Sequence, residues 1–168
     1  MRGGSASRTA VAAWTAARSP RPSHPSCLPS ARGVTSVFVT DDPIDPEVQE
    51  IAQRMFDAAR AGAADTLAAY LDAGVPVNLT NSTGDTLLML AAYHAHPAAV
   101  RVLIEHGADI DRLNDRGQSP LAGAVFKGAE EVVRALVAAG ADPHAGHPTA
   151  EDAARMFGRD DYLQLWHR

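Results

Sequence analysis

The chain has 168 residues, a length typical of one domain, and 46% of them are hydrophobic although only 5% are aromatic. All 20 Asp and Glu residues follow residue 40, where only ten of the 15 basic residues lie, so this part of the chain is strongly acidic. Phosphate binding needs a basic surface, and the composition therefore argues against a nucleic-acid partner. The longest apolar runs, such as Leu87 to Tyr93, are far shorter than the ~20 residues of a membrane-spanning helix.

Residues 1–40 are predicted to form a disordered tail, because they are rich in Ser, Pro, Arg and Ala and contain no acid. Two interpretations of residues 1–33 stay open. They are either a weak targeting segment, in which Arg2 and Arg8 precede the apolar run Ala10–Ala17, or a tail or upstream extension of the reading frame. We expect a cytoplasmic protein, or an exported or organellar one if this segment directs targeting.

From residue 41 to residue 168 the sequence repeats with a period of 33 residues. Gly74, Gly107 and Gly140 lie one period apart, and a similar sequence recurs around each of them. Such a period indicates a stack of one supersecondary unit, in which each unit packs only on its neighbours. We place the units at about 45–80, 81–113, 114–146 and 147–168.

Each unit is predicted to contain two short helices joined by a tight turn. Asp45 and Pro46 are typical of a helix start, and the apolar residues that follow keep helical spacing as far as Gly62. Polar segments rich in Asn, Asp and Gly separate one unit from the next and are expected to form turns. The predicted helices span residues 45–62, 64–73, 86–94, 97–106, 119–127, 129–139, 149–157 and 160–166.

Residue types at the repeated positions indicate how these helices begin and end. Thr86 and Ser119 precede apolar runs, where a hydroxyl caps free backbone N–H groups. The glycines of the period follow helices, where a left-handed residue ends the helix and only Gly adopts that conformation without steric cost. About three residues are missing from the last loop, within 145–148, which predicts an atypical end unit that closes the stack.

These features resemble ankyrin repeats. The resemblance rests on the period of 33, on the sequences Gly84–Ala92 and Gly117–Val125, and on the Gly-Ala-Asp that begins at Gly107 and Gly140. It covers about residues 51–166. It implies an all-α, ankyrin-type solenoid of about four helix-turn-helix repeats with short β-hairpin-like loops and atypical capping repeats.

One position departs from the motif of that family. The histidine that follows Thr-Pro-Leu in the family, where it hydrogen-bonds the turn, is replaced here by Met89 and Ala122. We therefore expect loops that adjust to a partner.

The resemblance implies a non-catalytic module that binds a partner protein through its concave face and loop tips. Tyr93, Phe126, Leu113 and Arg116 are the strongest candidates, because their types are enriched as interface anchors or are easily buried. For Tyr93 and Phe126, packing between helices stays an open alternative. Carried over position by position, the predicted contact residues are Thr83, Asp85, Tyr93, His94, Leu113, Asp115, Arg116, Gln118, Phe126 and Lys127.

No catalytic or metal site is predicted. The sequence contains neither a nucleophile elbow nor a phosphate-binding glycine-rich loop, and paired acids such as Glu130 and Glu131 are typical of solvated helix faces. Asp142, His144 and His147 lie close together in the chain, but three ligands in a flexible loop without cysteine fall short of a usual zinc site. We expect neither a metal nor a cofactor.

Two hypotheses about function stay open at this stage. The chain is either a general protein-binding module, acting as a monomer, or a dedicated accessory subunit that regulates or stabilises one enzyme. The partner is an unidentified protein in both cases. The number of partners distinguishes them, because a dedicated subunit co-purifies with a single enzyme.

Overall fold

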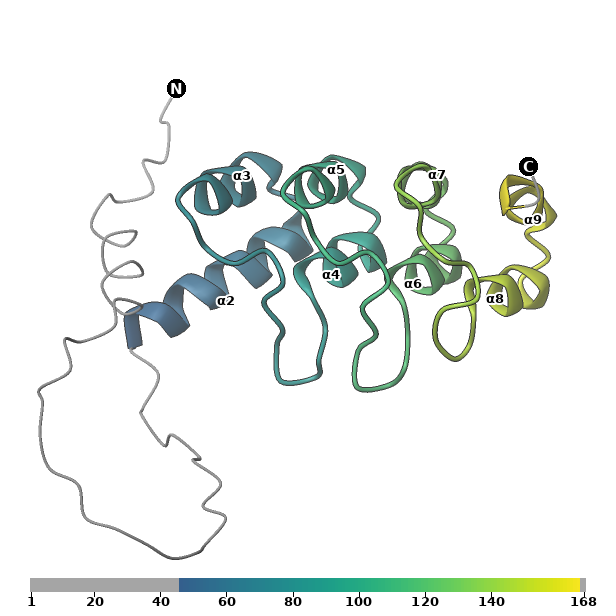
Figure 1. The fold of residues 1–168 in the computed structure, drawn as a ribbon, viewed down its shortest axis with the longest axis horizontal. Coiled ribbons are helices and arrows are strands. Elements are labelled where there is room, and N and C mark those ends of the chain that lie inside the picture. The colour runs from purple at the N-terminus through teal and green to yellow at the C-terminus, as the bar shows by residue number, and fades with distance from the viewer. Residues whose placement is uncertain (1–45, 167–168) are drawn as a thin grey trace, which may run out of the picture.

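The computed structural model describes residues 46–166, which form eight helices arranged in two rows (Figure 1). Each helix lies within one residue of its predicted bounds. The predicted tail at residues 1–40 and the expected capping role of Asp45 lie outside the described residues. The helices are α2 (Pro46–Ala61), α3 (Ala64–Asp72), α4 (Leu87–Tyr93), α5 (Pro97–Glu105), α6 (Pro120–Lys127), α7 (Glu130–Ala138), α8 (Ala150–Met156) and α9 (Asp160–Trp166).

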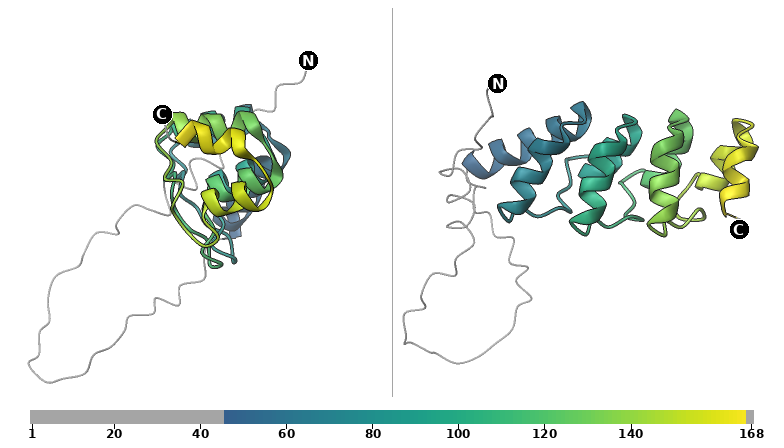
Figure 2. Two further views of the ribbon diagram at one scale, coloured as in Figure 1. Left: turned by 90° about the vertical axis from the view of Figure 1, so that its right-hand side faces the viewer. Right: turned by 90° about the horizontal axis from the view of Figure 1, so that it is seen from above.

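The helices stack as four pairs, and the main contacts of each pair are with the neighbouring pairs. Helices α2, α4, α6 and α8 pack successively on one another and form the inner row, while α3, α5, α7 and α9 form the outer row. The loops that join successive pairs project beyond the inner row on one side, as both views across and along the stack show (Figure 1, Figure 2). The fold is therefore an all-α solenoid with a helical wall and a row of loops beside it.

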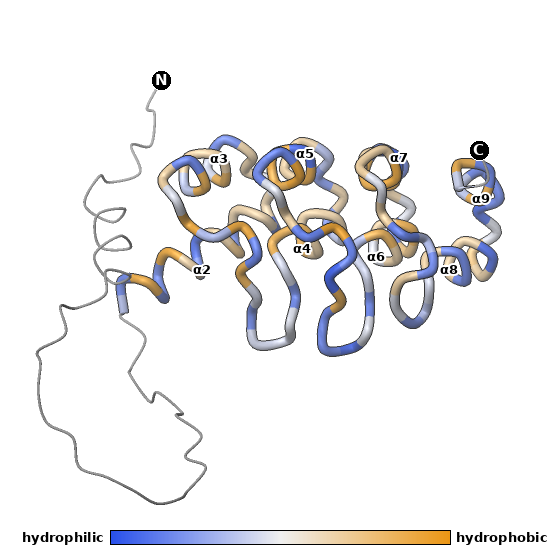
Figure 3. The backbone as a smooth tube through the Cα atoms, in the orientation of Figure 1, coloured by the Kyte–Doolittle hydropathy of each residue, from blue (hydrophilic) through white to orange (hydrophobic). Residues whose placement is uncertain are grey.

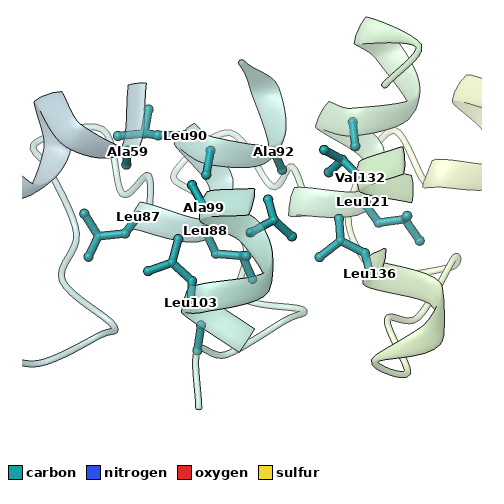
Figure 4. Packing of buried hydrophobic residues seen from close by; sticks show 14 of the residues in the cluster. Ala59, Leu87, Leu88, Leu90, Ala92, Ala99, Leu103, Leu121, Val132 and Leu136 are labelled. Atoms are coloured by element: carbon teal, nitrogen blue, oxygen red, sulfur yellow. The ribbon is translucent and has the colours of Figure 1, made fainter. Parts of the chain in front are cut away.

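Small and branched apolar residues recur at equivalent positions of each unit and form the core. Ala58, Ala91 and Ala124 are buried at one position of the inner row, where a short side chain lets neighbouring helices approach closely. Figure 4 shows larger residues between the rows, with Leu88 beside Leu103 in the second unit. Figure 3 shows that the apolar residues follow the helices whereas the projecting loops are mostly hydrophilic. Burial of each such Leu contributes about 1.5–3 kcal/mol.

The helix caps predicted at Thr86 and Ser119 are confirmed, and Thr149 at the start of α8 forms the same cap. The hydroxyls of Thr86, Ser119 and Thr149 accept hydrogen bonds from backbone N–H groups three residues later, at 3.1, 3.2 and 3.0 Å respectively. A single β-bridge between Thr80 and Thr86 closes the first inter-unit loop, and no β-strand forms within residues 46–166. The same cap thus opens three of the four inner helices.

The turn between the two helices of a unit also requires a left-handed residue. Gly62, Ala95 and Gly128 occupy this position, with φ values of 72°, 61° and 70°. A methyl group on Gly62 would lie 2.5 Å from the ring of His96, which the next unit packs against it. The residue of the third unit that corresponds to His96 is Ala129, whose side chain is short. Ala95 is therefore compatible with its neighbour, although its left-handed backbone still costs energy.

We predict that Gly62→Ala lowers the free energy of unfolding more than Gly74→Ala does. Both positions have positive φ, so each substitution costs about 1–2 kcal/mol in backbone strain. No atom would lie within 4 Å of a methyl group on Gly74, whereas Gly62 would also clash with His96. Urea titrations of the two variants give the comparison.

The clash is tested by adding His96→Ala to Gly62→Ala. The His96 ring cannot simply turn away at no cost, because its Nε2 is hydrogen-bonded to the Arg60 carbonyl at 2.8 Å. Because His96→Ala removes the ring, the double variant should lose less unfolding free energy than the two single variants lose in sum. Strictly additive losses would contradict this explanation of Gly62.

Candidate functional site

A groove of about 760 Å³ lies between the projecting loops and the inner row. Its floor is built by the C-terminal ends of α4, α6 and α8, and its rim by the first loop (residues 79–86) and the second loop (residues 112–119). Arg60, from the end of α2, closes one end of the lining, and Phe157, just after α8, closes the other. The groove therefore spans all four units.

Two asparagines hold the loops that form the rim. The side-chain oxygen of Asn81 accepts hydrogen bonds from the backbone N–H groups of Thr83 and Asp85, each at 2.9 Å. Asn114, one period later, accepts from the backbone N–H groups of Arg116 and Gln118 at 3.0 Å in the same way. Each asparagine thus closes its loop from within, at a position that the sequence analysis did not single out.

Hydrogen bonds also join each loop to the next. Asn114 Nδ2 donates to Asp85 Oδ1 at 2.8 Å, and the backbone N–H of Asp115 donates to the carbonyl of Thr83 at 3.2 Å. The backbone N–H of His147 donates to the carbonyl of Gly117 at 2.7 Å. These hydrogen bonds support each loop from its neighbour. The sequence led us to expect loops that adjust to a partner, and it did not predict this support.

Asp85 is the acceptor on which several of these bonds converge. Burial alone raises the pKa of its carboxyl, but hydrogen bonds from Thr83 and Asn114 lower it, so the pKa lies below its ordinary value. Asn81 and the charge of Arg116 act in the same direction. Asp85 is therefore ionised at neutral pH, and both of its oxygens already accept bonds from the protein.

Aromatic rings form a continuous row along the floor of the groove. The rings of Tyr93 and Phe126 are stacked with centroids 6.3 Å apart, and Phe126 meets Phe157 edge to face at 5.3 Å. These rings nevertheless stay 39%, 53% and 45% exposed in chain order, and Met156 beside them is 72% exposed. The aromatic residues thus pack against one another and also present a face to the groove.

Two nitrogen-bearing side chains lie next to Tyr93. The ammonium of Lys127 lies 4.5 Å from the centre of the Tyr93 ring, in the geometry of a cation–π contact. Burial lowers the pKa of the His94 imidazole, and the charges of His96 and Lys127 lower it further. His94 is therefore predominantly neutral at pH 7.

Comparison with known proteins agrees with this architecture. A family model described as ankyrin repeats in three copies matches residues 55–146, which is more than half of the chain. The chain belongs to the ankyrin repeat family. It is also 46% identical over 67 residues to a Pseudomonas aeruginosa protein named for ankyrin repeats, and the matched region covers 38% of this chain. That region spans 39% of the relative's length.

Most of the contact residues predicted for these ankyrin repeats line the groove. Three of the ten do not, namely Leu113, Asp115 and Lys127. Lys127 rests on Tyr93, and Leu113 is 43% exposed beside Gly146 of the following loop. A role in partner binding stays a prediction for all ten. The seven in the lining are Thr83, Asp85, Tyr93, His94, Arg116, Gln118 and Phe126.

Arg60, Met156 and Phe157 also line the groove and were not among the predicted contact residues, although the ankyrin period contains the signal that finds them. Arg60 lies one period before Tyr93, and Phe126 lies one period after it. Because the last loop is three residues shorter, the next equivalent position is Met156. Phe157 follows it directly in the chain. Four equivalent positions thus form one line across the groove.

Within residues 46–166, no group of three or more His, Cys, Asp or Glu side chains is arranged to hold a metal ion. Of the histidine cluster in the last loop, His144 lies 3.1 Å from Glu151 at the start of α8. None of the described helices is both long and apolar enough to cross a bilayer.

We predict that Asp85→Asn changes how the free energy of unfolding depends on pH. The pKa of Asp85 is lowered in the folded protein, so its ionised form stabilises the fold above the unfolded-state pKa. This contribution is lost as the pH falls through the folded-state pKa. Between about pH 6 and about pH 3, the wild type should lose more unfolding free energy than the variant.

Urea titrations at several pH values measure this difference. Asp161→Asn, which changes an exposed carboxylate on α9, is the matched control and should follow the wild type. Parallel pH profiles for the wild type and Asp85→Asn would show that the loop carboxylate does not stabilise the fold.

Proposed function

We propose that the chain is a non-catalytic module that binds a partner protein in the groove. The proposal rests on one observation about the exposed large apolar side chains of the described residues. Four of the five lie along this groove, namely Tyr93, Phe126, Met156 and Phe157. Contiguous apolar patches on soluble proteins mark interaction sites, whereas scattered single residues do not.

The anatomy of the groove supports the same proposal. Aromatic residues and methionine lie at the centre, and polar residues such as Arg116 and Gln118 lie at the rim, as in protein interfaces. Asn81 and Asn114 hold the rim in place before any partner arrives. A preformed rim reduces the conformational entropy that binding would otherwise cost.

The two hypotheses about function differ in the number of partners. A general module binds several proteins through this groove, whereas a dedicated subunit binds one enzyme and regulates or stabilises it. Affinity purification of the full chain from its native cells, followed by mass spectrometry, separates these cases. One enzyme recovered near one-to-one supports the dedicated subunit, and several proteins at lower ratios support the general module.

We predict that Tyr93→Ala combined with Phe126→Ala abolishes capture of the partner. Each ring is a central anchor, and loss of both should raise the Kd by about 100-fold or more. The helical circular dichroism should stay close to that of the wild type, because both rings are partly exposed. Titration of the purified partner measures the change.

Arg101→Ala combined with Arg134→Ala, on the outer helices α5 and α7, is the matched control and should bind like the wild type. Leu113→Ala tests the second loop separately, because this exposed side chain lies outside the groove lining. Unchanged binding by the Tyr93 and Phe126 double variant would place the contact elsewhere on the molecule.

A further inference from the structure

The charge of the groove differs in sign from that of the domain around it. Residues 46–166 contain seventeen Asp and Glu against nine Arg and Lys, so this domain is acidic. The lining of the groove, in contrast, contains Arg60 and Arg116 but only one carboxylate, that of Asp85. Lys127 adds a third positive charge directly above the Tyr93 ring. The lining thus carries two positive charges against one negative charge, on a protein that is acidic as a whole.

The one carboxylate of the lining is already engaged. Asp85 Oδ1 accepts from Asn114 at 2.8 Å, and Oδ2 accepts from Thr83 at 2.6 Å and from Asn81 at 3.3 Å. A basic side chain of a partner would have to displace these bonds to pair with Asp85. The lining therefore offers no free anionic group to a basic segment.

The cations of the lining keep donors for a partner. Arg60 gives one guanidinium nitrogen to Asp57 at 2.9 Å, and a guanidinium carries five N–H donors in all. The guanidinium of Arg116 makes no hydrogen bond or ion pair within the described residues, although its charge acts on Asp85. Both arginines can therefore bind carboxylates, for which their planar fork is well suited.

The aromatic floor disfavours a basic partner as well. Aromatic faces attract cations, but the ammonium of Lys127 already lies 4.5 Å from the centre of the Tyr93 ring. A second cation at this ring would be repelled by Lys127. Phe126 and Phe157 remain exposed beside it as surfaces for apolar side chains.

We propose that the groove takes an acidic segment of a partner protein, with carboxylates on Arg60 and Arg116 and apolar side chains on Phe126 and Phe157. The inference rests on the proposed function and adds the chemistry of the partner. Residues 1–40 of this chain carry five arginines and no acid, so like charge disfavours them as the occupant. Nucleic acid also supplies anions, but it carries one charge at every phosphate, and the two arginines of the lining are too few to offset its repulsion from the acidic domain.

Selection from a library of random peptides displayed on phage tests the inference with the full chain as bait. Peptides are retained only if the Tyr93→Ala and Phe126→Ala double variant fails to bind them. The retained peptides should be rich in Asp and Glu with apolar residues between them. Their Kd should rise as the salt concentration rises, because screening weakens contacts between charges.

Arg60→Gln combined with Arg116→Gln should raise the Kd of the retained peptides by about tenfold, because two ionic contacts are lost. Arg101→Gln combined with Arg134→Gln is the matched control, since it removes the same charge from α5 and α7. It should change the Kd by less than about twofold, because exposed charges far from an interface are screened.

Three results would overturn the inference and leave the proposed function intact. These are retained peptides that are basic or uncharged, an unchanged Kd for the Arg60 and Arg116 double variant, and self-association through the groove in analytical ultracentrifugation. Tight binding of a fluorescent single-stranded oligonucleotide would overturn the inference in favour of a different class of partner. If no peptide depends on Tyr93 and Phe126, the proposed function itself fails, and this inference fails with it.

Discussion

Close packing between neighbouring units of the inner row is the constraint on which the rest of this structure depends. No helix pair can bury its apolar face alone, so each unit is stabilised mainly by the next one. Ala58, Ala91 and Ala124 keep the inner helices close, and buried residues such as Leu88 and Leu103 fill the space between the rows. Because every unit repeats the same spacing, equivalent side chains of successive units lie side by side.

That spacing gives the loops and the groove their order. The Asn81 and Asn114 side chains fall in one line, close their own loops and join neighbouring loops through Asp85. Tyr93 and Phe126 fall in a second line and form the stacked centre of the groove floor. One line therefore supports the rim, and the other exposes apolar surface in the groove. In our proposal, Arg60 and Arg116 add selectivity for an acidic partner to this surface.

The helices could be predicted closely, because caps such as Thr86 and left-handed positions such as Gly74 are local signals. The exposed rings could be predicted in part, since Tyr93 and Phe126 stand at variable positions of complete repeats. Phe157 was missed because the deletion in the last loop shifts its position in the period. The bonds between loops could not be predicted, because Asn114 and Asp85 meet only after the units have stacked.

The central claim is that the groove between the loops and the inner row is the binding surface. Hydrogen–deuterium exchange on the full chain, with and without a captured partner, tests it most directly. The account predicts slower exchange in residues 81–85 and 114–118 and at the ends of α4 and α6, with no change in α5 and α7. Slower exchange confined to α5 and α7 would contradict it, because the partner would then cover the outer row.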